Sequence, residues 1–202
     1  MTPTVHQNTE VRQSQIVDAA MALMVKSGSD HVTVKRIAME VGISQAAVYR
    51  HFRSKNDILS NLIDHVRDNL LEDIEKGRNN DKDSSTPGVV DRTIRAHLSA
   101  VADRKGVSFL VLADIVSMGD PKLNGKASEA IRQYTAGIAD LLREGIKTGE
   151  IRGSLDIEAA ASILFDLVHG MVSVWTLGDR DFPLKERCGL LWSIFSEGIV
   201  AR

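Results

Sequence analysis

Residues 33–56 read TVKRIAMEVGISQAAVYRHFRSKN, and this stretch decides the fold. Its first half repeats apolar residues at the spacing of one helix face: Val34, Ile37, Ala38 and Val41. Thr33 is the expected N-cap of this helix, since a threonine oxygen can accept from a free backbone N–H. Gly42 follows the last apolar residue, where a helix commonly ends in a left-handed conformation that costs glycine least. The stretch therefore predicts a helix that ends at a tight turn.

The second half predicts another helix, which begins after Ser44 as its cap and buries a narrow edge through Val48 and Phe52. Its remaining faces present Gln45, Ala46, Ala47, Tyr49, Arg50 and His51. Two helices joined by a tight glycine turn form a helix-turn-helix, whose second helix enters the DNA major groove. The spacing alone also fits a helical hairpin in an ordinary bundle, with a solvated polar face.

The motif continues as AVYRHFxSKxDIL over residues 47–59, and in this register it resembles the N-terminal DNA-binding domain of the TetR family of bacterial transcriptional regulators. The resemblance covers roughly residues 10–70 and implies a dimeric, cytoplasmic regulator, more often a repressor, with operator DNA and a small-molecule effector as partners. It assigns phosphate contacts to Thr33, Ser44, Tyr49, His51 and Lys55. It places Lys35, Gln45, Ala46, Ala47 and Arg50 nearest the bases.

The charge of the chain is distributed unevenly along its 202 residues, although the net charge is only −2. Residues 1–56 hold seven Lys/Arg and four Asp/Glu, which gives +3 and leaves −5 for the rest. This asymmetry suits a basic DNA-binding head on an acidic body. We expect two domains: a tail at 1–8, a DNA-binding domain at 9–54 with its motif at 33–52, a connecting helix at 55–76, and an effector-binding and dimerisation domain at 77–202.

Cysteine content and hydropathy argue against several other classes of protein. Cys188 is the only cysteine, so the chain has neither a disulfide framework nor a cysteine-based zinc site, and we expect a reducing cytoplasm and no cofactor. The first ten residues lack the apolar core of a signal peptide, and residues 1–8 are expected to be a mobile tail. No apolar run was expected to reach the length that crosses a bilayer.

The rest of the chain predicts an all-α fold with about nine helices in all. The first helix is expected from Thr9 to Ser27, and Ser54 with Asp57 forms a capping-box pattern for the connecting helix. Residues 77–87 are polar and predict a surface loop before a helix that restarts at Thr86-Pro87. The apolar run 107–118 predicts a helix buried on most sides. After a break at residues 119–121, a long helix is expected to run to Gly149. Two further helices are expected at about 157–177 and 183–200.

The last two helices carry more apolar surface than a chain of this size readily buries. A four-helix interface with a second copy, which the family resemblance implies, would cover the surplus. The alternative is that these helices close the core of the monomer. The interface residues we expect are Ala160, Leu164, Leu167, Leu190, Leu191, Ile194 and Phe195.

The effector is expected among the middle helices, because small-molecule sites are mostly apolar with a few polar groups. Wall residues of this kind are Leu62, Val66, His97, Phe109, Met118, Tyr134 and Trp175, each of which also fits a plain core. Asp166 and His169 share a helix face and could suit a metal or a proton relay, or simply a buried polar contact. The sequence places no third ligand beside them, so we expect no metal site and no enzyme.

Two hypotheses therefore remain for a DNA-binding dimer. In the first, a small molecule releases the chain from a palindromic operator. In the second, the body is a protein-interaction module without such an effector. A small enzyme with an accessory DNA-binding domain is a third class, without positive support in the sequence. Neither the operator, the regulated genes nor the effector can be read from the residues.

Overall fold

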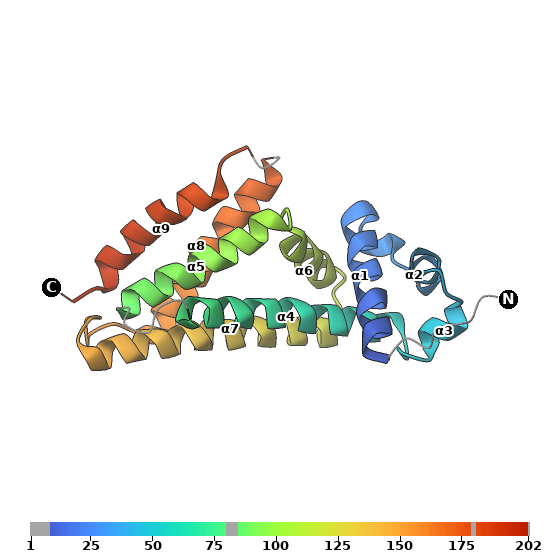
Figure 1. The fold of residues 1–202 in the computed structure, drawn as a ribbon, viewed down its shortest axis with the longest axis horizontal. Helices are drawn as coiled ribbons and strands as arrows, with labels where there is room; N and C mark the ends of the chain where they lie inside the picture. Colours follow the sequence, from blue (N-terminus) through green and yellow to red (C-terminus); the bar gives the residue numbers. More distant parts are fainter. Residues whose placement is uncertain (1–8, 80–84, 179–180, 202) are drawn as a thin grey trace. The chain divides into compact units, whose positions relative to one another are not determined.

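The computed structural model describes residues 9–79, 85–178 and 181–201, and within them every regular element is helical (Figure 1). The tail expected at residues 1–8 lies outside the described residues. The described helices are α1 (Thr9–Ser27), α2 (Val34–Val41), α3 (Gln45–Tyr49), α4 (Lys55–Asn79), α5 (Thr86–Asp103), α6 (Val107–Ser117), α7 (Pro121–Thr148), α8 (Ile157–Leu177) and α9 (Leu184–Ile199), with a 3-10 turn η1 (Ser29–His31). The all-α prediction is confirmed.

The helices form two compact units. The head unit holds residues up to His65 together with Leu110–Ala127, and the body unit holds Val66–Phe109 together with the chain from Ser128 onward. Helices α4, α6 and α7 each contribute residues to both units.

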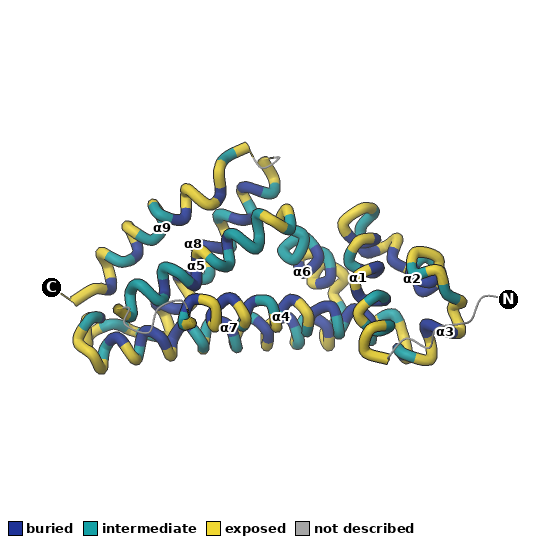
Figure 2. Tube along the Cα trace, in the orientation of Figure 1, coloured by how far each residue is buried: buried dark blue, intermediate teal, exposed yellow. Residues whose placement is uncertain are grey.

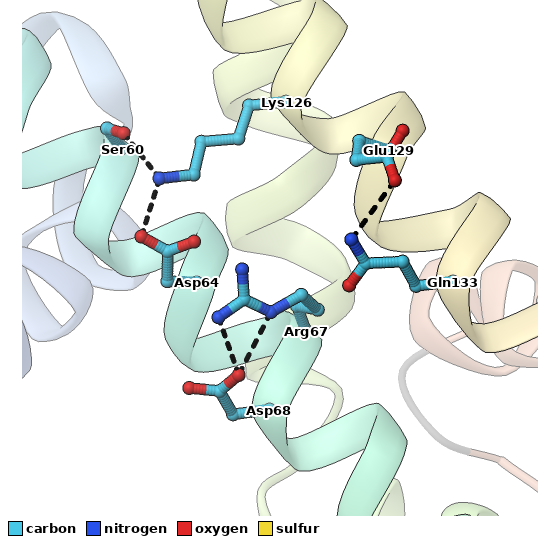
Figure 3. Close-up of polar contacts among 7 residues, drawn as sticks. All are labelled: Ser60, Asp64, Arg67, Asp68, Lys126, Glu129 and Gln133. Atoms are coloured by element: carbon cyan, nitrogen blue, oxygen red, sulfur yellow. Dashed lines mark hydrogen bonds and ion pairs between the residues drawn. The ribbon is translucent and has the colours of Figure 1, made fainter.

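In the head unit, α1 packs against η1 and α2, and α2 packs against α3. One face of α1 is buried, as the dark segments of Figure 2 show, and it includes Ile16, Ala20 and Leu23. Lys126 at the start of α7 ties this helix to the start of α4, because its Nζ donates to Ser60 Oγ at 2.7 Å and to Asp64 Oδ2 at 2.5 Å (Figure 3). The first helix matches its predicted bounds at both ends.

In the body unit, α5 packs against both α8 and α9, which also pack against each other. An isolated antiparallel bridge between Ile151 and Val200 fixes the end of α9, with Arg152 N donating to the carbonyl of Ile199 at 3.0 Å. The loop expected at 77–87 is partly wrong, since α4 continues to Asn79. Gly77 is a packing residue, because a Cβ there would lie 2.0 Å from Thr93 Oγ1 on α5.

Two further expectations need correction. Helix α6 is not buried on most sides, because only one of its faces packs inward and Val116 and Met118 are exposed. Helix α8 has the length and apolar composition that could cross a membrane, contrary to the expectation from the sequence. Its apolar residues are divided between two faces, one of which packs inward through Leu164, Val168 and Val172.

Candidate nucleic-acid interface

Local capping bonds hold the two helices of the motif at their turn. Thr33 Oγ1 accepts from Arg36 N at 3.2 Å, and Ser44 Oγ accepts from Ala47 N at 3.1 Å, as N-caps do. Gly42 is left-handed at φ 73°, and the following N–H of Ile43 donates to Ala38 O at 2.9 Å. The predicted helix-turn-helix is therefore present, and its turn needs glycine because other residues rarely adopt this conformation.

The outer face of α3 is a polar surface on a rigid support. Gln45, Ala46, Tyr49 and Arg50 are exposed, and Val48 beneath them is fully buried. Lys35 on α2 is exposed as well. Exposed amide and guanidinium groups at the start and end of a helix can hydrogen-bond to base edges and phosphates. The arrangement suits docking in a DNA groove.

Two residues that were expected to contact DNA, Ala47 and His51, are less exposed than predicted. Ala47 was expected on the outward face but is 9% exposed, because it packs beside Val48 on the inner edge. His51 is half-buried, and its carbonyl accepts from Gln13 Nε2 at 3.5 Å. Its Nδ1 is buried without a hydrogen-bond partner among the described residues. Only part of His51 is thus available to a phosphate.

Lys55 makes a hydrogen bond within the chain itself. Its Nζ donates to the carbonyl of Ser29 at 3.0 Å, and Ser29 Oγ donates to Asp114 Oδ1 on α6 at 2.9 Å. The start of α4 is also fixed by the predicted capping box, with Asp57 N donating to Ser54 Oγ at 3.1 Å and Arg53 N donating to Asp57 Oδ2 at 3.0 Å. An ammonium has three N–H donors, so Lys55 keeps donors for a phosphate.

Ser29 and Asp114 were not predicted from the sequence. They are 85 positions apart, and neither belongs to a local pattern that points to the other. Their contact places a residue of α6 one hydrogen bond away from the turn that holds Lys55. The position of Lys55, the lysine expected to contact a phosphate, therefore depends on α6.

Lys55→Ala should weaken binding to all DNA sequences alike and reduce the slope of log K against log salt by about 1, because one phosphate contact is lost. The measurement is DNA affinity at several salt concentrations, for a specific and a random duplex. Lys147→Ala is the matched control, because it removes an exposed lysine of the body unit that is not expected to contact DNA, so its salt slope should equal that of the wild type. A changed sequence preference with an unchanged slope for Lys55→Ala would contradict the phosphate assignment.

The body unit contains a small cavity of about 30 Å³. Of the expected wall residues, Val66, His97 and Phe109 line this cavity, and Tyr134 lies behind His97 with ring centroids 5.8 Å apart. Trp175 is buried and donates from Nε1 to the carbonyl of Phe182 at 3.0 Å. Leu62 and Met118 belong to the head unit. The other residues that line the cavity are Asn69, Leu70, Asp73, Ala100, Val101, Arg104, Gly106, Val107 and Ser108.

Asp73 is the most deeply buried of the polar lining residues that sequence reasoning missed. Its Oδ2 lies 3.1 Å from His97 Nδ1, and its side chain is 3% exposed. An aspartate in an otherwise charged helical stretch carries no mark of burial, so no pattern identified it.

His169 lies in an aromatic cluster of the body unit. Its ring stacks on Phe165 at 5.0 Å and meets Phe109 edge-on at 4.8 Å. Burial lowers the pKa of His169, with a further lowering from nearby His97 that the Asp166 charge opposes. Asp166 itself is exposed to solvent. The two residues expected to share a helix face therefore lie in different surroundings, with His169 packed among aromatic rings.

The expected interface residues divide into two groups. Ala160, Leu164 and Phe195 are buried within the body unit, and Leu191 is half-buried. Apolar residues of α8 and α9 that remain exposed in the single chain form what we call the α8–α9 stripe: Ile163, Leu167, Val174, Leu177, Leu190 and Ile194. Ile163 and Val174 were not predicted, although their spacing from Leu167 along one helix face would have found them.

Comparison with known proteins finds two family models that match different parts of the chain. The family model "Bacterial regulatory proteins, tetR family" matches residues 16–62, and the model "YsiA-like protein, C-terminal region" matches residues 59–198. The chain is 25% identical over 186 residues to the fatty acid metabolism regulator protein of Bacillus subtilis strain 168, covering 92% of this chain and 94% of that protein. It is 30% identical over 189 residues to the nucleoid occlusion factor SlmA of Salmonella paratyphi A, covering 92% and 93%.

A solved structure shares the fold along nearly the whole chain. The transcriptional regulator FadR from Bacillus subtilis, in complex with stearoyl-CoA, superposes with a TM-score of 0.81 at 24% identity. The match covers 92% of this chain and 98% of that one.

Proposed function

Because this chain belongs to the TetR family of bacterial regulatory proteins, it is a DNA-binding transcriptional regulator and not an enzyme, and we propose that a small molecule releases it from an operator with inverted repeats. Repression is the mode we propose, in the bacterial cytoplasm where the DNA lies. The observation that carries the DNA-binding part is the exposed polar face of α3, held by caps at Thr33 and Ser44.

Sequence recognition falls on few residues. Gln45 has an amide that can pair with both polar atoms of an adenine edge, and Arg50 has a guanidinium that suits guanine or a phosphate. Ala46 leaves room for the helix to approach the bases but provides no hydrogen bond. With so few base contacts, we propose that DNA shape contributes to the choice of operator.

The effector part rests on the cavity of the body unit and on the helices that line it. The relatives supply precedent, since the B. subtilis relative is named for fatty acid metabolism and FadR was crystallised with stearoyl-CoA. In this chain, α6 lines the cavity with Val107–Phe109, and further along the same helix Asp114 accepts from Ser29. Helix α4 lines it with Val66, Leu70 and Asp73 and begins at Lys55. A ligand that shifts either helix can change the position of Lys55. It can change the affinity for DNA by no more than the difference between its own affinities for the two states.

The interaction-module alternative has one observation in its favour, the 30% identity with a nucleoid occlusion factor. In that case the body would bind another protein, and no small molecule would release operator DNA. The two functions are separated by whether any compound both binds the body and releases the operator.

Gln45→Ala should cost roughly 1–3 kcal/mol of binding free energy at the preferred operator and much less on random DNA, because a base contact discriminates among sequences. Titration of both duplexes at one salt concentration measures the difference. Gln133→Ala, the same substitution on α7 in the body unit, should leave both affinities unchanged. Equal losses on operator and random DNA would remove Gln45 from the base-reading residues.

A further inference from the structure

Asp73 carries a buried carboxylate oxygen that accepts no hydrogen bond from the described residues. Its Oδ2 is paired with His97 Nδ1 at 3.1 Å, but Oδ1 has no hydrogen bond within the described part of the chain. The ammonium of Lys76 lies 3.7 Å from Oδ1, which is beyond hydrogen-bond distance. A buried carboxylate oxygen in this condition is costly, because it has given up its hydration without a replacement.

This oxygen belongs to a residue that lines the cavity of the body unit. The cavity volume of about 30 Å³ is room for about two water molecules or one small polar group. Its surroundings are mostly apolar, with Val66, Leu70, Val101, Val107 and Phe109 among the lining residues. A mostly apolar wall with a few polar groups is the composition of a small-molecule site.

Two of the side chains near Asp73, Tyr134 and His169, do not offset its negative charge. Burial and the Asp73 charge both raise the pKa of Tyr134, so the phenol stays neutral beside it. The pKa of His169 is lowered by burial and by His97, so this ring adds no positive charge at neutral pH. Arg104 and Lys76 are the cations of the surroundings; Arg104 lines the cavity half-exposed, and Lys76 is 45% exposed. A carboxylate placed against Oδ1 would bring two acceptors together without a donor between them.

We propose that Asp73 binds the polar end of the effector through Oδ1, and that this end is an N–H or O–H donor on an otherwise apolar molecule. A primary amine and an alcohol share this chemistry, whereas a carboxylate and an ether lack a donor. This assignment rests on the proposed function, because it names the ligand class of the effector site.

The apolar body of such a ligand needs more space than the cavity now offers. Part of the wall is the first turn of α6, Val107–Phe109, which begins after two residues of positive φ, Lys105 at 55° and Gly106 at 74°. Entry of a ten-carbon chain must displace lining side chains, and displacement of this turn moves the helix that carries Asp114. Binding at Asp73 is thereby linked to the residue that holds Ser29 and Lys55.

The test uses four probes with the same ten-carbon chain on the full-length protein: decylamine, 1-decanol, decyl methyl ether and decanoate. Thermal stabilisation gives the apparent affinity of each, and anisotropy of labelled operator DNA gives release. The amine and the alcohol should bind at least about tenfold more tightly than the ether and decanoate, since a hydrogen bond to a buried charge is gained. The difference between amine and alcohol shows whether the donor is charged. Equal or tighter binding of decanoate or the ether would overturn the proposal, as would no binding of any probe.

Asp73→Asn removes the charge at nearly constant shape and should reduce the preference for the amine over decanoate by about tenfold or more. Glu75→Gln is the matched control, because it removes an exposed charge two positions away and should leave the preference unchanged. An unchanged preference in a folded Asp73→Asn protein would overturn the proposal, and the ranking on the wild-type chain tests it even if that variant does not fold. Selective binding without release of DNA would support the site and contradict only the effector part of the proposed function.

Discussion

Ile194→Glu should give a folded monomer that no longer binds the operator. Ile194 is 74% exposed and Leu190 is 67% exposed on α9, and both belong to the α8–α9 stripe. In a two-fold dimer the same patch meets its own copy, so one substitution places two carboxylates in the contact. Burial of each unpaired charge costs several kcal/mol, which should raise the dimer dissociation constant by at least about a thousandfold.

Loss of the dimer removes the second recognition helix from the operator. Inverted half-sites are read together because protein symmetry is mirrored in the DNA, and a single head keeps only the affinity of one half-site. Ile194 is a better test position than Leu191, which is half-buried within its own chain. Since Ile194 is exposed in the single chain, the charge should not disturb the fold of the monomer.

Sedimentation of the purified variant and operator titration measure these two effects. Lys185→Glu is the matched control, because it also adds a negative charge to an exposed position of α9 but lies off the stripe and replaces an ion pair with Asp103. It should remain dimeric. A soluble Ile194→Glu monomer with full operator affinity, or an unaltered dimer, would contradict the interface assignment.

Gly77→Ala should destabilise the body unit, although alanine normally stabilises a helix interior by about 0.5–1 kcal/mol relative to glycine. The new Cβ would lie 2.0 Å from Thr93 Oγ1 and 2.9 Å from the Thr93 backbone nitrogen. Thr93 is fully buried, and its hydroxyl donates to the carbonyl of Val89 at 3.0 Å. Rotating the Thr93 side chain would break this hydrogen bond and would still leave the close contact with the backbone nitrogen. Overpacking of this kind costs about 1–3 kcal/mol, and the melting temperature should fall by roughly 2–12 °C.

Gly125→Ala on α7 supplies the opposite expectation for the same substitution. No atom lies within 4 Å of the Cβ that would be added there, so the melting temperature should stay the same or rise. The comparison is made by thermal unfolding of both variants in one buffer. If Gly77→Ala stabilised the protein as much as Gly125→Ala, the close contact between α4 and α5 would be disproved.

The head unit was predictable because its determinants are local. A cap, an apolar face and a left-handed glycine lie within a few positions of one another in the sequence, and the structure contains the caps at Thr33 and Ser44 and the box at Ser54 and Asp57. The outward position of Ala47 was misjudged, because a helix of five residues has no clear periodicity and its inner edge is wider than Val48 alone.

The body unit was predictable only in outline. Helical spacing gave the order of helices, but the pairing of Asp73 with His97 joins two helices across 24 positions, and neither residue reveals burial by its neighbours in sequence. Gly77 was misinterpreted as part of a loop because glycine serves turns and close helix contacts equally well. Exposed Ile163 and Val174 could have been inferred from their spacing, but not which face of α8 packs inward.

Selection of DNA from a random duplex pool by the purified chain tests the central claim most directly, when the mass of the selected complex is measured as well. We predict an enriched inverted repeat with two half-sites, bound by two chains, and loss of that enrichment in Gln45→Ala. The account would be contradicted by a pool without an enriched sequence, or by a single half-site that one chain binds at full affinity.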